Sequence, residues 1–510
     1  MDGPLVKKYF LKLAPPSMED SAADLERVIR SLSEVCPGEF DVPLSVASKI
    51  PDVLRQSGFE LTVTVSFSDT RSIIDAEPGD TSGRCFGLAI DLGTTNVVGV
   101  LLDLAEGRQL GELSDVNPQI AHGEDILNRI HFCLKKGNLE ELQRQAAGCI
   151  NSIARRISDA AGIGVHEIGC VSVSGNTTMA HLFLGLDPYN ICRAPYVPVA
   201  NHFGFFRAAD LGLDINPEGA AYVLPNVGSY VGGDVLAGVL VSGMHERSEV
   251  SLMVDVGTNA EIVIGNRDWL LVCAGAAGPA LEGGVVKFGM RAMPGAIERI
   301  KINPETMRSE YSVIGGQGVK PRGMCGSALI DLLAELFLKG LIDGRGKFVE
   351  PFLPGVREND GLREYVVAPA ADAEAGEDIV FTEADIDNLV RTKAAMYTAL
   401  NVVTRELGMS FHDLAEFSIA GTFGAYIAAD KAVAIGMVPD IELSKYSLLG
   451  NSSLKGACKT LLSREAINEV ERIASMITYK ELNVSTDFMS EFRAAMFLPH
   501  TDASLFPNIV

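Results

Sequence analysis

The sequence predicts an α/β protein built from two similar halves and preceded by a small α/β unit. A strand, a tight turn and a second strand occur at residues 85–104 and again at 250–265, and helices follow the strands both times. The two turns share the pattern Asp-x-Gly-Thr. A segment containing glycine and proline, 76–84, separates the first unit from the two halves. Because 510 residues exceed what one core usually supports, two or three domains are expected.

The first unit is expected to alternate strands and helices. Its elements are a strand at 5–13, a helix capped by Asp20 or Ser21, a helix at 44–56 interrupted near Pro51, and a strand at 60–67. The helix assignments rest on apolar residues at helical spacing, and the last strand rests on alternation.

The two halves supply the remaining elements in chain order. The first half is expected to contain strands in 85–104, helices at 126–134 and 139–161, a buried strand at 169–174, a mostly loop stretch at 187–228, and a helix after Gly233. The second is expected to contain strands in 250–265, helices at 327–339 and 384–407, and a buried strand at 417–420. We therefore expect domains at 1–80, 85–235 and 236–510.

Composition and charge exclude several classes of protein. The formal net charge of −23 argues against a nucleic-acid-binding protein, because a phosphate backbone requires a basic face. No apolar run approaches the roughly 20 residues that a membrane span needs, and the first residues lack the apolar core of a signal peptide. These features are typical of a cytoplasmic protein that binds small ligands or other proteins.

The cysteines and histidines do not form a recognisable metal-binding pattern. The nine cysteines are too widely spaced for a CxxC zinc site or closely spaced iron–sulfur ligands, and most lie in apolar segments. The eight histidines form no HxH or HxxxH pair. His181 lies in an apolar helix, which is more typical of a core residue than of a metal ligand.

The repeated turn is the main candidate for a ligand site. It reads Asp91-Leu92-Gly93-Thr94-Thr95-Asn96 in the first half and Asp255-Val256-Gly257-Thr258-Asn259 in the second. Glycine lets backbone N–H groups approach an anion, and threonine and asparagine add donors for phosphate oxygens. Each aspartate would suit a hydrated Mg²⁺. A single copy is equally typical of a structural hairpin; two copies in one chain favour the phosphate-binding interpretation.

Two further glycine segments have the composition of nucleotide-binding loops. The strand at 417–420 ends on Gly421-Thr422-Phe423-Gly424, where a nucleoside would lie on backbone. Gly323-Met324-Cys325-Gly326-Ser327 opens an apolar helix, whose N-terminus suits a phosphate or ribose. The alternative for the second segment is a plain serine cap.

Several pieces of the sequence together resemble a known family. They are LAIDLGTTNVVG, NPQIAHGEDILNRI, VSGNTTMAHLFLGL, LPNVGSYVGGDVLAG, VDVGTNAEIVIG, AAGPALEGG, GMCGSALIDLL and FLPHTDASLFPNIV. The turns and the late glycine loop resemble the superfamily of acetate and sugar kinases, heat-shock chaperones and actin. The pieces as a set are similar to the reductive activators of corrinoid-dependent enzymes, over essentially the whole chain.

This resemblance implies a fold and an activity. The fold would be two actin-like (RNase H-like) subdomains around an ATP cleft, preceded by a small α/β middle domain. The activity would be ATP-dependent reduction of an inactive Co(II) corrinoid to Co(I), with Mg²⁺ as a further cofactor. The partner would be a corrinoid iron–sulfur protein or a methyltransferase corrinoid subunit, bound by a monomer or a homodimer.

The resemblance also raises the question of the electron donor. Such activators carry a 2Fe-2S ferredoxin-like domain at their N-terminus, whereas this sequence begins where the middle domain would begin. We therefore expect the chain to be a fragment of a longer protein, the alternative being an external electron donor.

The superfamily assigns roles to the matching residues. The phosphate-binding residues would be Gly93, Thr94, Thr95, Asn96, Gly257, Thr258 and Asn259. Asp91 and Asp255 would order Mg²⁺ and the attacking water. Gly421, Thr422 and Gly424 would contact the nucleoside, with Gly326 and Ser327 near the ribose or base.

Three weaker candidates have structural alternatives. Asn176 and Asp234 follow strand ends that would face the cleft, and either residue would equally serve as a helix cap. The glycine-rich segment 278–284 would contact the corrinoid partner or merely close a hairpin.

Two other functions would use the same fold. A small-molecule kinase would need a dedicated base, for which Asp234 is the only candidate. A chaperone-like module would use ATP only to regulate partner affinity.

Overall fold

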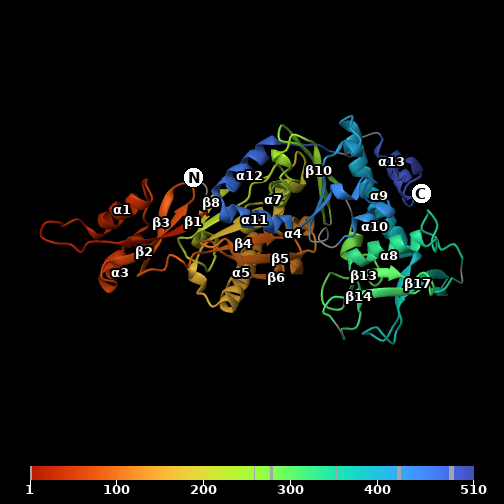
Figure 1. The fold of residues 1–510 in the computed structure, drawn as a ribbon, viewed down its shortest axis with the longest axis horizontal. Helices are drawn as coiled ribbons and strands as arrows, with labels where there is room; N and C mark the ends of the chain where they lie inside the picture. Colours follow the sequence, from red (N-terminus) through yellow and green to blue (C-terminus); the bar gives the residue numbers. More distant parts are fainter. Residues whose placement is uncertain are drawn as a thin grey trace. The chain divides into compact units, whose positions relative to one another are not determined.

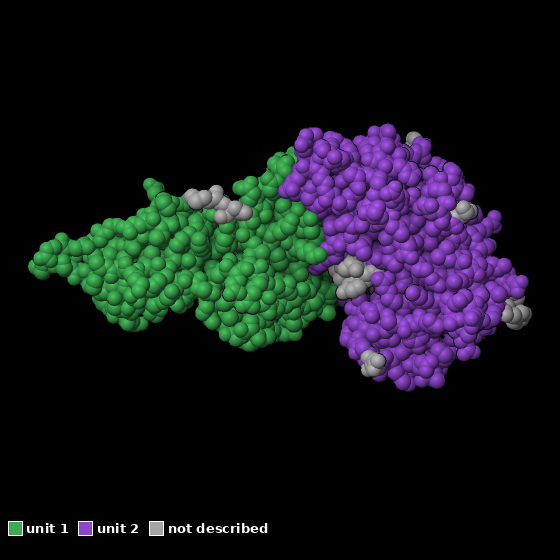
Figure 2. Space-filling model, in the orientation of Figure 1, with its two compact units in different colours: residues 1–241, 452–476 green, residues 242–451, 477–510 purple. Residues whose placement is uncertain are grey.

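The computed structural model describes residues 3–257, 259–275, 279–316, 318–350, 353–359, 361–421, 427–481 and 487–509. The chain forms two compact units, coloured separately in Figure 2. Unit 1 comprises residues 1–241 and 452–476, and unit 2 comprises 242–451 and 477–510. Among the helices of the described residues, none is long and apolar enough to cross a membrane.

The N-terminal part of unit 1 is a three-stranded antiparallel sheet with three helices. Its elements are β1 (Val6–Lys12), α1 (Asp24–Val35), α2 (Leu44–Ala47), α3 (Ile50–Gln56), β2 (Glu60–Phe67) and β3 (Arg71–Pro78). The two strands expected here are confirmed. β3 was not expected, because its Pro78 and Glu77 belong to the segment interpreted as a linker.

The predicted cap of the first helix is wrong. Helix α1 begins at Asp24 after Ala23, which makes no capping hydrogen bond. The carboxylate of Asp20 instead accepts a hydrogen bond from Nη1 of the buried Arg27 at 2.7 Å, and this bond lowers the pKa of Asp20 to about 2. The predicted helix break comes before Pro51, which lies in the first turn of α3, where a missing N–H is tolerated.

The main sheet of unit 1 has six strands in the order β6-β5-β4-β7-β9-β8. Its strands are β4 (Phe86–Leu92), β5 (Asn96–Asp103), β6 (Arg108–Val116), β7 (Ile168–Ser174), β8 (Gly204–Arg207) and β9 (Ala220–Val223). β4, β5 and β6 form an antiparallel meander, and β7 and β9 continue the sheet parallel to β4. The parallel pairing places Asp91 beside Ser174 at the carboxyl ends of β4 and β7.

Two helices cover the faces of this sheet (Figure 1). Helix α5 (Asn138–Ala161) packs on β5 and β6, and α11 (Ser452–Leu462) packs on β4 and β7. Leu88 and Ile90 of β4 share a core with α5, whereas Asp91 contacts Ser453 of α11. Because successive strand residues point to opposite faces, α5 and α11 lie on opposite sides of the sheet.

The other helices of unit 1 are short connections and one C-terminal helix. They are η1 (Pro118–His122), α4 (Ile126–Phe132), η2 (Val165–Glu167), α6 (Thr177–Leu184), η3 (Tyr189–Cys192), η4 (Ala208–Leu211), α7 (Gly233–Ser242) and α12 (Arg464–Met476). The expectation that 187–228 is mostly loop is wrong in part, since β8 and β9 lie there. The buried β9 is only four residues long, too short for its periodicity to be visible.

The main sheet of unit 2 repeats the plan of unit 1. Its order is β20-β19-β10-β11-β12-β21. Its strands are β10 (Ser251–Val256), β11 (Ala260–Gly265), β12 (Leu270–Gly275), β19 (Phe417–Ala420), β20 (Tyr446–Gly450) and β21 (Ile477–Tyr479). β10, β11 and β12 form an antiparallel meander, and β19 and β20 continue parallel to β10. The prediction of two similar α/β halves is confirmed.

Unit 2 also contains two small sheets and a helical layer. The sheet strands are β13 (Ala296–Ile302), β14 (Ser309–Val313), β15 (Gly323–Met324), β16 (Val356–Asn359), β17 (Leu362–Ala368) and β18 (Ile379–Thr382). The helices are η5 (Met244–Glu246), η6 (Pro279–Glu282), α8 (Gly326–Leu338), α9 (Glu383–Glu406), η7 (Phe411–Asp413), α10 (Ala429–Ala434), η8 (Leu443–Lys445), α13 (Phe488–Ala495) and η9 (Ala503–Leu505).

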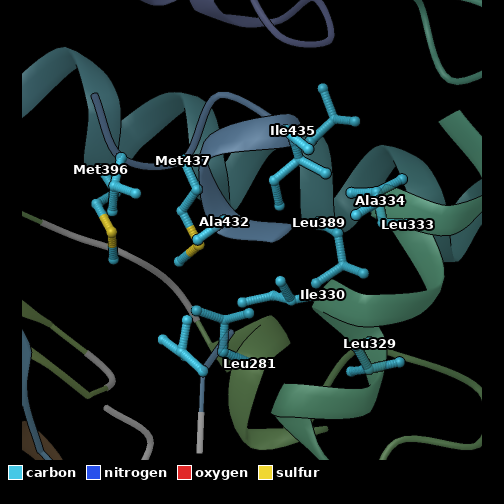
Figure 3. Close-up of a cluster of buried hydrophobic side chains, with 14 of the residues drawn as sticks. Leu281, Leu329, Ile330, Leu333, Ala334, Leu389, Met396, Ala432, Ile435 and Met437 are labelled. Carbon is cyan, nitrogen blue, oxygen red and sulfur yellow. The ribbon is translucent and has the colours of Figure 1, made fainter. Parts of the chain in front are cut away.

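The core of unit 2 gathers where α8, α9 and α10 meet (Figure 3). Ile330 and Leu333 of α8 face Leu389 of α9 and Ala432 of α10, all fully buried or nearly so. This packing explains the apolar composition of α8 and holds its N-terminus in place.

Candidate functional site

The turn of unit 1 joins β4 to β5 and can be made only with glycine at position 93. A Cβ atom there would lie 2.6 Å from the carbonyl oxygen of Asn96, closer than real Cβ contacts allow. Thr94 and Thr95 are half-buried, and Asn96 is exposed. The turn therefore combines a close backbone reversal with the polar groups that would suit an anion.

Asp91, at the end of β4, is held by a serine from a distant part of the chain. Ser453 Oγ donates a hydrogen bond to Asp91 Oδ1 at 2.7 Å across 362 residues of sequence, and it lies 2.9 Å from Ser174 Oγ. Ser453 and Ser174 are both buried. The Asp91 carboxylate thus has a fixed orientation at the carboxyl edge of the sheet.

Asp234 lies close to Asp91, in the first turn of α7. Its Oδ1 accepts a hydrogen bond from the N–H of Val235 at 2.8 Å. The loss of hydration in this environment raises the pKa of Asp234 to about 6, and the neighbouring Asp91 carboxylate adds to the rise. One carboxylate of this pair therefore titrates near neutral pH.

Asn176 connects the turn to helix α6 through the oxygen and the nitrogen of its side-chain amide. Its Oδ1 accepts from the N–H of Met179 at 3.0 Å, which caps α6. Its Nδ2 donates to Thr94 Oγ1 at 3.0 Å. The structure thus brings together four predicted residues of unit 1: Asp91, Thr94, Asn176 and Asp234.

Glycines make this close approach of chain segments sterically feasible. A Cβ atom on Gly232 would lie 2.4 Å from Asn176 Cα and 2.7 Å from Asp234 Oδ1. A Cβ atom on Gly175 would lie 2.7 Å from the carbonyl oxygen of Leu92. Larger residues at either position would push the carboxylates apart.

The turn of unit 2 repeats this arrangement after β10. Asp255 is half-buried at the strand end, and the N–H of Gly257 donates to the carbonyl of Asn259 at 2.9 Å. The parallel pairing of β10 with β19 sets Asp255 beside Ala420. Gly421 follows with φ +91°, and a Cβ atom on it would lie 2.7 Å from Asp255 Oδ1. The second turn and the start of the glycine loop are therefore neighbours.

The start of α8 differs from the expectation of a serine cap. The N-cap is Cys325, which makes no side-chain capping bond. The hydroxyl of the buried Ser327 donates to the carbonyl of Glu298 on β13 at 2.9 Å. Gly326 is also buried, and the Ser327 side chain is occupied by this bond.

Four predicted positions lie outside the described residues: Thr258, Thr422, Gly424 and Gly278.

The carboxylate arrangement fits Mg²⁺ better than a protein-caged metal. Within the part of the chain that the structure describes, no three His, Cys, Asp or Glu side chains gather closely enough to hold an ion. Magnesium usually takes one or two carboxylates and fills its remaining positions with water and substrate phosphates. Asp91, at the end of β4, and Asp255, at the end of β10, each offer one such carboxylate.

Four residues that the sequence did not reveal contact the unit 1 turn or the Asp91 cluster: Ser453, Ser174, Asn117 and Arg129. Ser453 belongs to no motif near the turns. Asn117 and Arg129 belong to the segment NPQIAHGEDILNRI, which carried the family resemblance without a chemical role. That match was the only available signal.

Comparisons with known proteins identify the family. Models of the RACo linker region, the RACo middle region and the C-terminal domain of RACo, the ASKHA domain, match residues 3–83, 86–247 and 249–510. The corrinoid activation enzyme RamQ of Eubacterium limosum is 35% identical over 502 residues, covering 96% of this chain and 82% of that protein. The [Co(II) methylated amine-specific corrinoid protein] reductase of Methanosarcina barkeri is 26% identical, covering 79% of this chain and 74% of that protein.

A solved structure agrees with these sequence matches. The reductive activator for corrinoid, iron-sulfur protein superposes with a TM-score of 0.91 at 42% sequence identity, covering 99% of this chain and 81% of that chain. The predicted actin-like fold is thereby confirmed, since the family's C-terminal domain is described as an ASKHA domain. The chain belongs to the RACo family of corrinoid reductive activators.

Proposed function

We propose that this protein binds a corrinoid protein and uses ATP to drive reduction of its inactive Co(II) corrinoid to Co(I). The observation that carries the proposal is similarity along nearly the whole chain to a corrinoid activation enzyme, at 35% identity. The two aspartate–glycine turns, at equivalent strand ends of two similar sheets, support the use of a nucleotide.

Unit 1 would bind phosphate through its turn. The backbone of Gly93 and the polar groups of Thr94, Thr95 and Asn96 would donate to phosphate oxygens. Asn176 would hold the Thr94 hydroxyl in position through its 3.0 Å hydrogen bond.

Unit 2 would supply the second phosphate turn and the nucleoside contacts. Gly257, Thr258 and Asn259 would bind phosphate. The positive φ of Gly421 turns the chain beside Asp255. Thr422 and Gly424 would also contact the nucleoside. Gly326 and Ser327 would contribute backbone N–H groups at the start of α8.

Hydrolysis would depend mainly on positioning and charge. A bound Mg²⁺ would neutralise charge on the phosphates. Asp91 and Asp255 would accept hydrogen bonds from its waters, with Asp91 oriented by Ser453. Asp234, whose pKa of about 6 leaves it ionised at neutral pH, would accept a proton from the attacking water.

The nucleotide would act on the cobalt centre only through the difference in its affinity for two conformational states of the protein. A ligand shifts an equilibrium by no more than its differential affinity for the two states, so turnover requires hydrolysis. Reduction of Co(II) to Co(I) consumes one electron, which we propose comes from a 2Fe-2S centre or another low-potential donor outside the described residues.

One experiment separates this function from its alternatives. The protein is mixed with ATP, Mg²⁺, an artificial low-potential reductant and a Co(II) corrinoid protein, and Co(I) is followed by its absorbance. ATP-dependent Co(I) formation supports the proposal. Phosphorylation of an added acetate or sugar, without binding of the corrinoid protein, would establish a kinase instead. Binding that ATP regulates, without reduction, would establish a chaperone-like module.

A further inference from the structure

The segment 117–130 lies behind the phosphate turn of unit 1 and binds the carbonyl groups of three consecutive residues. The backbone N–H of Asn117 donates to the carbonyl of Thr95 at 2.9 Å, and Asn117 Nδ2 donates to the carbonyl of Gly93 at 2.9 Å. Arg129 Nη2 donates to the carbonyl of Thr94 at 2.5 Å. Two residues thus fix every carbonyl of the turn.

Both residues are themselves rigidly held. Asn117 and Arg129 are fully buried. Asn117 Oδ1 accepts from the N–H of Gln119 at 3.0 Å, and Arg129 donates to the Gln119 side chain at 3.1 Å and to the carbonyl of Gly123 at 2.9 Å. Gln119 donates in turn to the carbonyl of Leu142 on α5 at 2.8 Å. The turn is therefore fastened to the core of unit 1.

The hydrogen bonds to the turn carbonyls determine the direction in which the backbone N–H groups of the turn point. In a trans peptide the carbonyl of one residue and the N–H of the next point in opposite directions. Because the carbonyls of Gly93, Thr94 and Thr95 point at Asn117 and Arg129, the N–H groups of Thr94, Thr95 and Asn96 point away from them. An array of N–H groups facing one way is the feature that binds phosphate.

Arg129 also places a positive charge behind the turn. Its hydrogen-bond acceptors are neutral groups, and no carboxylate of the described residues forms an ion pair with it, although the charge of Asp125 in the same segment partly compensates its own. Burial lowers the pKa of Arg129 to about 10, so the guanidinium stays charged at neutral pH. A buried cation without a carboxylate partner is costly, and an anion on the other side of the turn would compensate it.

We propose that Asn117 and Arg129 are positioning residues for a nucleoside polyphosphate: they aim the N–H groups of the unit 1 turn at its phosphates, and Arg129 adds an attractive charge from behind. This inference rests on the proposed function, in which the same turn binds ATP. Its ligand class is the polyphosphate, so its effect must grow with the number of phosphates.

Two conservative variants test the inference. Asn117→Asp keeps the acceptor for Gln119 and removes the donor to Gly93, and Arg129→Lys keeps the charge but loses the forked set of donors. We measure dissociation constants for adenosine, ADP and ATP by calorimetry with Mg²⁺ present, together with kcat and KM for ATP hydrolysis. Melting temperatures are recorded without nucleotide.

Matched controls exist elsewhere in unit 1. The amide of Asn151 has the same bonding pattern, accepting from the N–H of Asp214 and donating to the carbonyl of Gly212. The buried Arg27 donates to the carbonyls of Ala14 and Asp20 in the N-terminal sheet region. Asn151→Asp and Arg27→Lys therefore report the general cost of such changes.

The expected result is a loss that depends on phosphate. Each site variant should weaken ATP binding about tenfold or more, ADP less, and adenosine hardly at all, with KM rising by a similar factor, because about 1.4 kcal/mol of hydrogen bonding corresponds to a factor of ten. The controls should leave all three affinities unchanged. Should a site variant fail to fold, Asn117→Ser and Arg129→Gln are measured in the same way.

Two outcomes would overturn the inference. One is an equal loss for adenosine and ATP; the other is behaviour of the site variants that matches the controls. If either outcome is found while the wild-type protein hydrolyses ATP and supports Co(I) formation, the role of Asn117 and Arg129 is refuted and the proposed function stands. If the wild-type protein binds no ATP, the proposed function fails and the inference fails with it.

Discussion

The environment of Asp91 is built by parts of the chain far from it in sequence. Its carboxylate is oriented by Ser453 of α11 and is close enough to Asp234 of α7 to raise that residue's pKa. Strand β4 alone would place Asp91 at the carboxyl end of the sheet, but it would not fix the orientation of the carboxylate. Its orientation and the protonation of its neighbour come from elements that follow much later in the sequence.

Ser453→Ala tests whether orientation of Asp91 matters for hydrolysis. A hydrogen bond to a charged group contributes about 1.5–3 kcal/mol, so kcat for ATP hydrolysis should fall about tenfold to a hundredfold. The variant should remain folded, because one hydroxyl is removed. Ser57→Ala removes a hydroxyl bonded to the carbonyl of Val53 in the N-terminal region and serves as the control. If Ser453→Ala hydrolysed ATP at the wild-type rate, Ser453 would not position Asp91 for hydrolysis.

Asp234 should make stability depend on pH in the nucleotide-free protein. Its folded-state pKa of about 6 exceeds the ordinary value of 3.8, so the folded chain binds more protons than the unfolded chain between these values. Its contribution to stability is therefore present below about pH 4 and is lost as the pH rises through 6, by at most about 3 kcal/mol.

Denaturant unfolding from pH 4 to pH 7 measures this effect. Asp234→Asn cannot titrate, so the difference in unfolding free energy between the variant and the wild type should change across that window. If the difference in unfolding free energy stayed constant from pH 4 to pH 7, the pKa of Asp234 would not be raised by its environment.

Helix α6 is joined to the following irregular segment through a neutral histidine. His181 is fully buried, as its apolar helix predicted, with Nδ1 2.7 Å from the carbonyl of Thr177 and Nε2 accepting from the N–H of Val199 at 3.2 Å. Only a ring protonated at Nδ1 alone satisfies both bonds. Burial lowers the pKa of His181 below 6.5, so a second proton would disrupt the bond to Val199.

His181 should therefore make the region around α6 sensitive to acid. A lowered histidine pKa means that the unfolded chain binds more protons below pH 6.5, so the stability contributed by His181 is present above 6.5 and is lost as the pH falls through the folded-state pKa. The protection factors of residues 177–203 against hydrogen exchange should fall between pH 7 and pH 5, and less so in His181→Gln, which keeps an acceptor. An equal fall in both proteins would exclude His181 as the cause.

The C-terminal segment is fastened to helix α9 by a buried lysine. Lys393 Nζ donates to the carbonyls of Phe497 and Pro499, the latter at 2.7 Å, and burial lowers the pKa of Lys393 well below its ordinary value. Gly436 must be glycine beside this segment, since a Cβ atom on it would lie 2.0 Å from the carbonyl oxygen of Pro499.

Lys393→Met should lower the unfolding free energy by about 2–4 kcal/mol, because it leaves two buried carbonyls without a donor. Urea denaturation measures the loss. Lys7→Met, an exposed lysine on β1, should change stability by less than about 0.5 kcal/mol. A negligible effect of Lys393→Met would mean that the segment is held by its apolar contacts alone.

Among the secondary-structure elements, sequence periodicity predicted the long helices and the strands of the repeated turn. The helices α5 and α9 and the strands that flank both aspartate turns have clear spacing, and their predicted bounds lie within a few residues of the observed ones. β9 is too short to show a period, and the strands β13 to β18 lie in mixed sequence that was left unassigned. Their pairing is decided by tertiary packing, which a local pattern does not contain.

For the site, the sequence revealed residues that share a motif and missed those that act from elsewhere. Asp91, Thr94, Asn176 and Asp234 were candidates from strand ends and turns, and the structure gathers them. Ser453 and Arg129 reach the same place through folding alone. Their types and spacing carry no signal, because serine and arginine are common and both reach the site through contacts between residues far apart in the sequence.

At the scale of the whole molecule, two units share one sheet plan and one turn, yet the chain enters unit 1 twice. Residues 452–476 return to it after most of the sequence of unit 2. This return brings Ser453 to Asp91, so the half-site of unit 1 is incomplete until the later sequence has folded. We therefore expect residues 1–241 alone to lack part of the site.

The most direct measurement of the central claim is a single-turnover assay of Co(I) formation. Protein, Co(II) corrinoid protein, Mg²⁺ and a low-potential reductant are combined with ATP or with a non-hydrolysable ATP analogue, using the wild type and Asp255→Asn. We expect Co(I) only for the wild type with ATP, while Asp255→Asn remains folded and inactive in hydrolysis. Equal Co(I) formation with the analogue, or in Asp255→Asn, would contradict the claim that ATP hydrolysis at these turns drives the reduction.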